Sequence, residues 1–135
     1  MPVLVDTSVW IEYFRKGETG EILDFLIEEN LVVINDLILA ELVPYLRVRR
    51  QDRVVELLHH LNNPGLEIDW KEIIDFQYLC LHNGLNGIGT PDLIIAQNAK
   101  QHDCEIYSLD GHFRLMKDIL GLRLTEDNKS WKGRS

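Results

Sequence analysis

The sequence has few cysteines and no long apolar run. Its two cysteines, Cys80 and Cys104, lie far apart and lack the paired spacing of a metal-binding motif, so we expect both to be reduced and buried. No apolar stretch approaches the roughly 18 residues that a membrane span requires. Asp6 and Glu12 interrupt the N-terminal segment, and no basic start precedes an apolar core, which argues against a signal peptide. We therefore expect a cytoplasmic protein that is not embedded in a membrane.

Positive charge is also scarce. The formal net charge is −8, which argues against binding of nucleic acid by electrostatics alone, since such proteins usually carry a basic face. Four arginines nevertheless lie close together in the sequence: Arg47, Arg49, Arg50 and Arg53. Two interpretations of this run stay open, a solvated junction between two helices and a patch that contacts RNA phosphates.

Repeats, low-complexity segments and internal linkers are absent, and 135 residues suit a single domain. Short apolar runs alternate with segments of helical periodicity, which predicts an α/β fold with a parallel sheet. We expect strands at residues 3–5, 31–34, 66–68 and 105–109, and the run 122–124 is compatible with a fifth strand. Residues 1–125 are predicted to form the domain, and residues 126–135 a polar C-terminal tail.

Four acidic residues are candidates for a functional site: Asp6, Glu41, Asp92 and Asp110. Asp6 and Asp110 follow predicted strands, and residues just past the carboxyl ends of parallel strands converge on one crevice. Glu41 lies within apolar sequence, where an unpaired buried carboxylate would cost several kcal/mol, so we expect a cation or another partner for it. Carboxylates gathered in one pocket stay ionised only if cations neutralise them, which points to hard divalent metals and to phosphate chemistry.

Each acid also has an ordinary structural explanation. Asp6 could simply cap the first helix, and Asp110 followed by Gly111 is a normal turn pair. Asp92, in the first turn of a predicted helix, would gain roughly 0.3–1 kcal/mol from the helix dipole without any metal. His112 is most simply a lone surface histidine. The set of four acids, rather than any one of them, supports a metal site.

Four segments carry a resemblance to a known family: VDTSVWI at residues 5–11, LAEL at 39–42, PDLIIA at 91–96 and SLDGHF at 108–113. They closely resemble the four motifs of PIN-domain ribonucleases, and the chain length is similar to that of the VapC-type toxins of toxin–antitoxin pairs. The resemblance covers about residues 1–125. It implies a PIN-like three-layer α/β/α fold with a central, mainly parallel sheet of four to five strands.

The resemblance implies a metal-dependent endoribonuclease that hydrolyses RNA phosphodiester bonds. Its catalytic and metal-binding residues would be Asp6, Glu41, Asp92 and Asp110, holding one or two Mg²⁺ or Mn²⁺ ions. Asp6 and Asp92 would be the main direct ligands, Glu41 would act through water, and Asp110 would complete a second ion site.

Three hydroxyls are expected to orient those carboxylates: Thr7, Ser8 and Ser108. Helix capping and turn bonding are equally good explanations for them. Asn35 and Asp36 stand where the family often has Ser or Thr, and Ser108 replaces a more usual Thr while keeping the hydroxyl.

The resemblance also implies partners. These are a VapB-type antitoxin that enters the acidic groove, an RNA substrate such as a tRNA or rRNA loop, promoter DNA bound only through the antitoxin, and a second copy of the chain in a homodimer. An apolar surface for the antitoxin could be formed by Trp10, Tyr13, Phe14, Tyr45 and Leu46.

Other functions remain as alternatives. A housekeeping PIN nuclease that processes RNA and a catalytically inactive PIN scaffold that binds protein or RNA both fit the motifs. A phosphorylation-receiver domain does not, because it needs paired acids after the first strand and a lysine at the end of the last. A haloacid-dehalogenase-like phosphatase needs a second Asp two residues after Asp6, where this chain has Ser8.

Overall fold

The computed structural model describes residues 1–15 and 20–125 and shows an α/β fold. In chain order the elements are β1 (Val3–Val5), α1 (Thr7–Phe14), α2 (Gly20–Glu28), β2 (Val32–Val33), α3 (Asp36–Val48), α4 (Asp52–His59), α5 (Trp70–His82), α6 (Thr90–Gln101), β3 (Glu105–Tyr107) and α7 (Gly111–Leu120). The predicted polar tail, residues 126–135, lies outside the described residues. Within the described part, no helix is long and apolar enough to cross a membrane.

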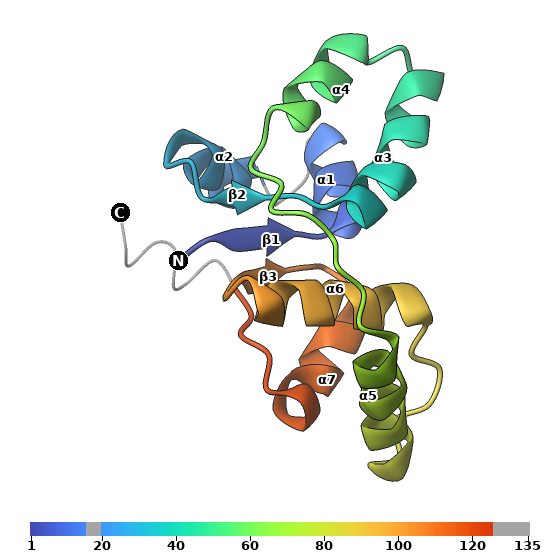
Figure 1. Cartoon of the computed structure of the whole chain (residues 1–135). Helices are drawn as coiled ribbons and strands as arrows, with labels where there is room; N and C mark the ends of the chain where they lie inside the picture. The colour runs from blue at the N-terminus through green and yellow to red at the C-terminus, as the bar shows by residue number, and fades with distance from the viewer. Residues whose placement is uncertain (16–19, 126–135) are drawn as a thin grey trace.

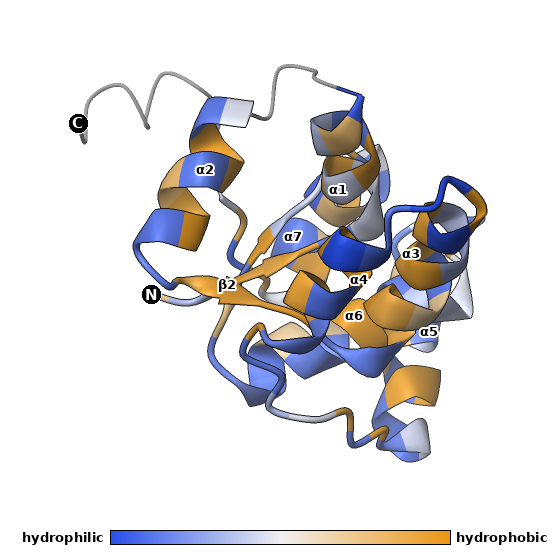
Figure 2. Ribbon diagram, turned by 90° about the horizontal axis from the view of Figure 1, so that it is seen from above, coloured by the Kyte–Doolittle hydropathy of each residue, from blue (hydrophilic) through white to orange (hydrophobic). Residues whose placement is uncertain are grey.

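The sheet is parallel and has the order β2-β1-β3. Leu4 of β1 pairs with Val33 on one side and with Ile106 on the other. Figure 1 shows α1 to α4 on the β2 side and α5 to α7 on the β3 side. Viewed from above, α1 and α2 cover one face of the sheet and α6 the other (Figure 2). All three residues of β1 are buried, as expected for a strand with both faces covered.

The sheet is smaller than predicted, with three strands in the described residues instead of four or five. The expected strand at residues 66–68 is a loop. Side-chain amides of α6 contact the backbone here: Gln101 donates to Glu67 O at 2.9 Å, and Gln97 donates to Asp69 O, just after the run, at 3.0 Å. At the sheet edges, residues 62 and 124 each contribute one isolated parallel bridge, so the run 122–124 is not a full strand either.

The helix starts place the candidate site at one edge of the sheet. The N-cap of α1 is Asp6, rather than Thr7 or Ser8, so both hydroxyls are free for other contacts. Asn35 caps α3, accepting a hydrogen bond from the Ile38 amide at 2.9 Å. The first turn of α6 contains Asp92, as the sequence predicted.

Both cysteines are reduced and buried, as predicted. Burial raises the pKa of the Cys80 and Cys104 thiols, which keeps them in the unreactive protonated form. They belong to the apolar core.

A buried pair of asparagines joins the two halves of the chain. The Asn35 amide donates to Asn98 Oδ1 at 2.9 Å, and the Asn98 amide donates to Gly65 O at 3.0 Å. Asn35 is 0% exposed and Asn98 2%. Buried amides are costly unless both their donors and acceptors are paired, so this pair fixes how α3, the loop at Gly65 and α6 meet.

Asn98→Ala is expected to lower the free energy of unfolding by roughly 2–4 kcal/mol, because it leaves the buried Asn35 amide donor and the partly buried Gly65 carbonyl without partners. Chemical denaturation followed by circular dichroism measures the change. Gln101→Ala, which removes an exposed side chain that makes one hydrogen bond, serves as the control and should cost less than about 1 kcal/mol. Equal losses in the two variants would contradict this role for Asn98.

Candidate metal centre

The four candidate acids lie together beside the carboxyl ends of β1 and β3. Asp6 follows β1, Asp110 caps α7 just after β3, and Asp92 lies in the first turn of α6. Glu41 lies in the second turn of α3. Partial desolvation is the main cause of the raised pKa values of Glu41 and Asp92, and neighbouring charges add to it: those of Asp6 and Asp92 at Glu41, and those of Asp110 and Asp6 at Asp92. The structure therefore brings all four predicted site acids into one cluster.

Asp6 is the buried member of the cluster, with 7% of its surface exposed. Its Oδ2 accepts hydrogen bonds from Ser108 Oγ at 2.7 Å and from Ser8 Oγ at 2.9 Å. Each serine is held in turn by the loop after β3, since Ser8 Oγ accepts from the Leu109 amide and Ser108 Oγ from the Asp110 amide. The two hydroxyls occupy Oδ2, and in the described part of the chain Oδ1 accepts no side-chain hydrogen bond, so Oδ1 is available for a cation.

Glu41 differs from expectation because it is exposed, not buried among apolar neighbours. On α3, residues 38, 42 and 46 face the core, and Glu41 lies on another face of the helix. The third predicted hydroxyl contacts this acid: Thr7 Oγ1 donates to Glu41 Oε1 at 3.0 Å. Partial desolvation of the carboxyl and the charges of Asp6 and Asp92 raise the pKa of Glu41, while the Thr7 hydrogen bond lowers it.

His112 is not the lone surface histidine expected from the sequence. Its Nδ1 lies 3.0 Å from Asp92 Oδ2 and 3.5 Å from Asp110 Oδ1. The hydrogen bond with Asp92 and the charge of Asp110 raise the pKa of His112. Desolvation raises the pKa of Asp92 in spite of the opposing His112 hydrogen bond. Sequence reasoning missed this contact because it depends on where α6 and α7 meet in space.

The donor set fits a hard divalent ion. Ligand atoms of Asp92, Asp110 and His112 all lie within 4.8 Å of one another. Carboxylate oxygens are the ligands that Mg²⁺ and Mn²⁺ prefer, and a doubly charged ion would offset the desolvation and the mutual repulsion that raise the pKa values of Glu41 and Asp92. The site can therefore concentrate positive charge where a phosphate group could approach.

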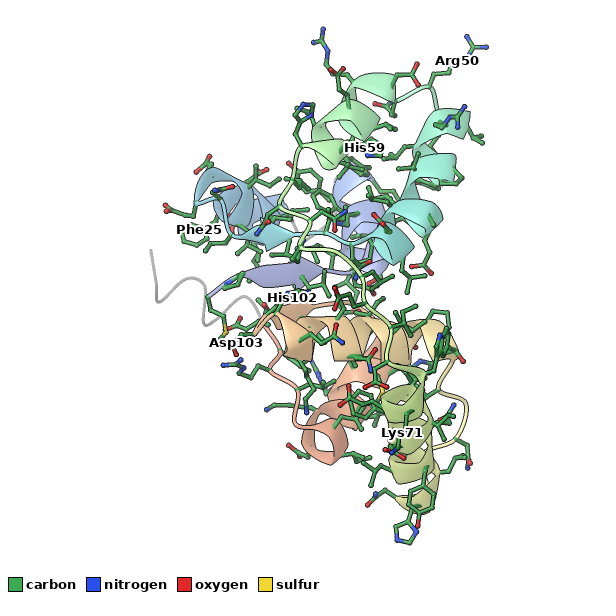
Figure 3. All side chains as sticks on the ribbon, viewed as in Figure 1. Phe25, Arg50, His59, Lys71, His102 and Asp103 are labelled. Atoms are coloured by element: carbon green, nitrogen blue, oxygen red, sulfur yellow. The ribbon has the colours of Figure 1, made fainter. Side chains whose placement is uncertain are left out.

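The four arginines are not part of this cluster. All of them are exposed and lie at the end of α3, in the following loop and at the start of α4: Arg47, Arg49, Arg50 and Arg53. Figure 3 shows Arg50 at the outer end of these two helices. Arg49 stacks on the Tyr45 ring, with its guanidinium carbon 3.7 Å from the ring centroid. The arrangement leaves both interpretations of the run open.

Asp92→Asn is expected to lower the pKa of His112 in the metal-free protein, because the variant removes the carboxylate that is its closest partner. The raised folded-state pKa means that this contact contributes stability below the ordinary histidine pKa, and that the contribution disappears as the pH rises through the raised value. An NMR titration of the imidazole C–H signals tests the shift. Asp75→Asn, on exposed α5 surface, is the control. An unchanged His112 pKa in Asp92→Asn would contradict the contact.

Solved structures with this fold come from several bacteria. VapBC2 from Rickettsia felis, bound to a DNA fragment from its promoter, has a TM-score of 0.74 and 19% identity, covering 95% of this chain and 100% of its own. DNA-bound VapBC from Salmonella typhimurium has a TM-score of 0.70 and 17% identity, with coverages of 93% and 97%. FitAcB from Neisseria gonorrhoeae has a TM-score of 0.68 and 19% identity, with coverages of 92% and 96%.

The sequence comparisons identify the family. A search of curated proteins gives no significant match. A family model described as the PIN domain matches residues 3–119, which include all four acids and both serines that contact Asp6. The match spans most of the 135 residues. The chain therefore belongs to the PIN-domain family.

Proposed function

We propose that the chain is a metal-dependent endoribonuclease that acts as the toxin of a VapBC-type toxin–antitoxin pair. The observation that carries the proposal is the convergence of Asp6, Glu41, Asp92 and Asp110 beside the ends of two parallel strands. Family membership supports nuclease chemistry. The VapBC complexes among the similar solved structures support the toxin role.

Asp6 and Asp92 are the proposed direct ligands of one or two Mg²⁺ or Mn²⁺ ions. Ions bound there would supply a water of lowered pKa and neutralise the charge that develops on the phosphate and on the leaving 3′ oxygen. Ser8 and Ser108 fix the orientation of Asp6 by donating to its Oδ2. We assign the orientation of the attacking water to Glu41, which accepts a hydrogen bond from Thr7. Asp110 adds a further carboxylate next to Asp92.

The proposed antitoxin surface is smaller than the sequence suggested. Trp10 and Leu46 are core residues, with exposures of 3% and 0%. Tyr13, Phe14 and Tyr45 remain half-buried at the surface of α1 and α3. The Tyr13 hydroxyl donates to Asp24 of α2, so a contact within the chain already fixes the orientation of this side chain. These three aromatic side chains, on the same pair of helices as Glu41 and its partner Thr7, are the part of the surface that we assign to an antitoxin segment.

A homodimer is also proposed. Exposed apolar residues recur along one face of α5, with exposures of 53–68%: Trp70, Ile74, Tyr78 and Leu81. Burial of such a stripe against a second copy would remove a large apolar area from water. The molar mass in solution, measured by light scattering, decides between monomer and dimer.

A housekeeping RNA-processing nuclease remains the nearest enzymatic alternative, and a catalytically inactive scaffold is the alternative without activity. A short reading frame directly upstream that encodes a DNA-binding protein favours the toxin role over the housekeeping one. Any binding of promoter DNA would then occur through that partner.

The purified chain is expected to cleave cellular RNA in Mn²⁺ or Mg²⁺, and a chelator should abolish the cleavage. Asp6→Ala and Asp92→Asn should each reduce the rate at least about 100-fold, because each removes a proposed direct ligand. Ser108→Ala removes one of the two hydroxyls on Asp6 and should cost roughly 10-fold. Gel analysis of total RNA over time provides the measurement.

Asp75→Asn, an exposed acid of α5 outside the cluster, is the matched control and should cleave at the parent rate. Cleavage that survives in Asp92→Asn would rule out the acidic cluster as its source. Absence of cleavage by the metal-loaded parent protein, free of antitoxin, would favour the scaffold.

A further inference from the structure

A hollow of about 610 Å³ adjoins the acidic cluster on the side of α7. It shares Ser108 and Asp110 with the cluster, and its walls come from β3, α7 and the residues after α7. Because Ser108 also donates to Asp6 at 2.7 Å, the hollow begins one hydrogen bond away from the buried acid of the proposed centre. Its volume falls within the range of about 300–1,000 Å³ that small-molecule sites occupy.

Two cations line this hollow, Arg114 and Lys117. They are three residues apart on α7, so they are neighbours on the helix surface. Both side chains are exposed, and among residues 1–15 and 20–125 neither charged group has an ion-pair or hydrogen-bond partner. Arg123, by contrast, is paired with Asp103. In a chain with a net charge of −8, two unpaired cations beside an acidic cluster form a local site for anions.

The rest of the lining suits a nucleoside. Leu109 and Leu124 contribute apolar surface, whereas Phe113 is only 1% exposed and the Thr125 hydroxyl already donates to Glu105. Leu109 is 52% exposed, so it offers an apolar face that a base can cover. Proteins that bind single-stranded RNA combine such apolar contacts to bases with cations that follow the backbone.

We propose that this hollow binds the nucleotide of the RNA next to the scissile phosphate, with Arg114 and Lys117 contacting the backbone phosphates on that side. The inference rests on the proposed ribonuclease function, and it specifies where the RNA chain lies next to the scissile phosphate. A phosphate placed at the acidic cluster has its neighbouring nucleotide at the hollow, because Ser108 and Asp110 border both. The arginine run on α3 and α4 is not required for this contact.

The test compares the double variant Arg114→Gln/Lys117→Gln with the charge-matched double variant Arg15→Gln/Lys71→Gln. Arg15, at the C-cap of α1, and Lys71, on α5, are exposed and do not line the hollow; Figure 3 labels Lys71. The probe is a short fluorescein-labelled single-stranded RNA in chelator, where the proposed cleavage cannot occur. Fluorescence anisotropy gives the dissociation constant at several salt concentrations.

Arg114→Gln/Lys117→Gln is expected to bind the RNA roughly 10-fold more weakly at physiological salt. The slope of log K against log salt concentration should also become shallower by about 1.4, because each of the two lost phosphate contacts on a single strand contributes about 0.7. The control variant should show a smaller change in both quantities. In Mn²⁺, the same loss should raise the KM for RNA cleavage more than it lowers kcat, because the cations hold substrate outside the reacting centre.

A second pair of variants tests whether RNA binding needs the empty volume of the hollow. A Cβ at Gly111 would meet no atom within 4 Å, and Gly111 lines the hollow. Gly111→Leu should weaken RNA binding by obstructing the hollow, whereas Gly111→Ala should bind close to the parent affinity. Circular dichroism confirms that both variants are folded.

The outcomes separate the inference from the function on which it rests. If Arg114→Gln/Lys117→Gln binds RNA as its control does while Mn²⁺-dependent cleavage persists, the hollow is not the nucleotide site and the ribonuclease proposal stands. If the parent protein neither binds nor cleaves RNA, both proposals are wrong. Selective loss of RNA affinity in the α7 variant, with cleavage depending on Asp92, supports both.

Discussion

The gathering of four carboxylates at one partly desolvated end of the sheet is the constraint on which the site depends. Asp6 is buried, and partial desolvation, with a further contribution from the charges of neighbouring acids, raises the pKa values of Glu41 and Asp92. Such a group is stable only if donors and cations compensate it. The protein supplies two hydroxyls to Asp6, one hydroxyl to Glu41 and one imidazole to Asp92. A divalent ion would complete this compensation.

The fold brings the acids together by using strand and helix ends. The Asp6 amide donates to Tyr107 O at 2.9 Å, which ties the end of β1 to the end of β3. The same edge then receives the starts of α1, α6 and α7. On the opposite side of β1, α3 contributes Glu41 from a helical turn rather than from its terminus. The buried Asn35–Asn98 hydrogen bond links the start of α3 to α6. The position of Glu41 on α3 relative to Asp92 on α6 therefore depends on a contact outside the cluster.

Much of this arrangement could be predicted from sequence because it follows from local pattern. An apolar run followed by Asp6, and Pro91 followed by Asp92 at a helix start, fix those two acids at element ends. Burial of Glu41 was predicted wrongly because its apolar neighbours in sequence face the core from other positions of the helix. The strand predicted at residues 66–68 was wrong: this segment is a loop whose Glu67 carbonyl accepts from Gln101 of α6, a contact between residues distant in sequence. The His112 contact and the α7 hollow likewise depend on packing between elements.

The site and the hollow together suggest a division of roles along the substrate. The acids would hold metal and act on one phosphate, while Arg114 and Lys117 would hold the adjoining backbone. An acidic protein could then bind RNA through a few well-placed cations and bound metal, without the broad basic face that its composition lacks.

The most direct test of the central claim is anomalous diffraction at the manganese absorption edge from crystals of the chain grown or soaked with Mn²⁺. An anomalous peak is expected within coordination distance of the carboxylates of Asp6 and Asp92, and it should be lost in crystals of Asp92→Asn. A well-ordered acidic cluster with no peak, or a peak only at another part of the surface, would contradict it.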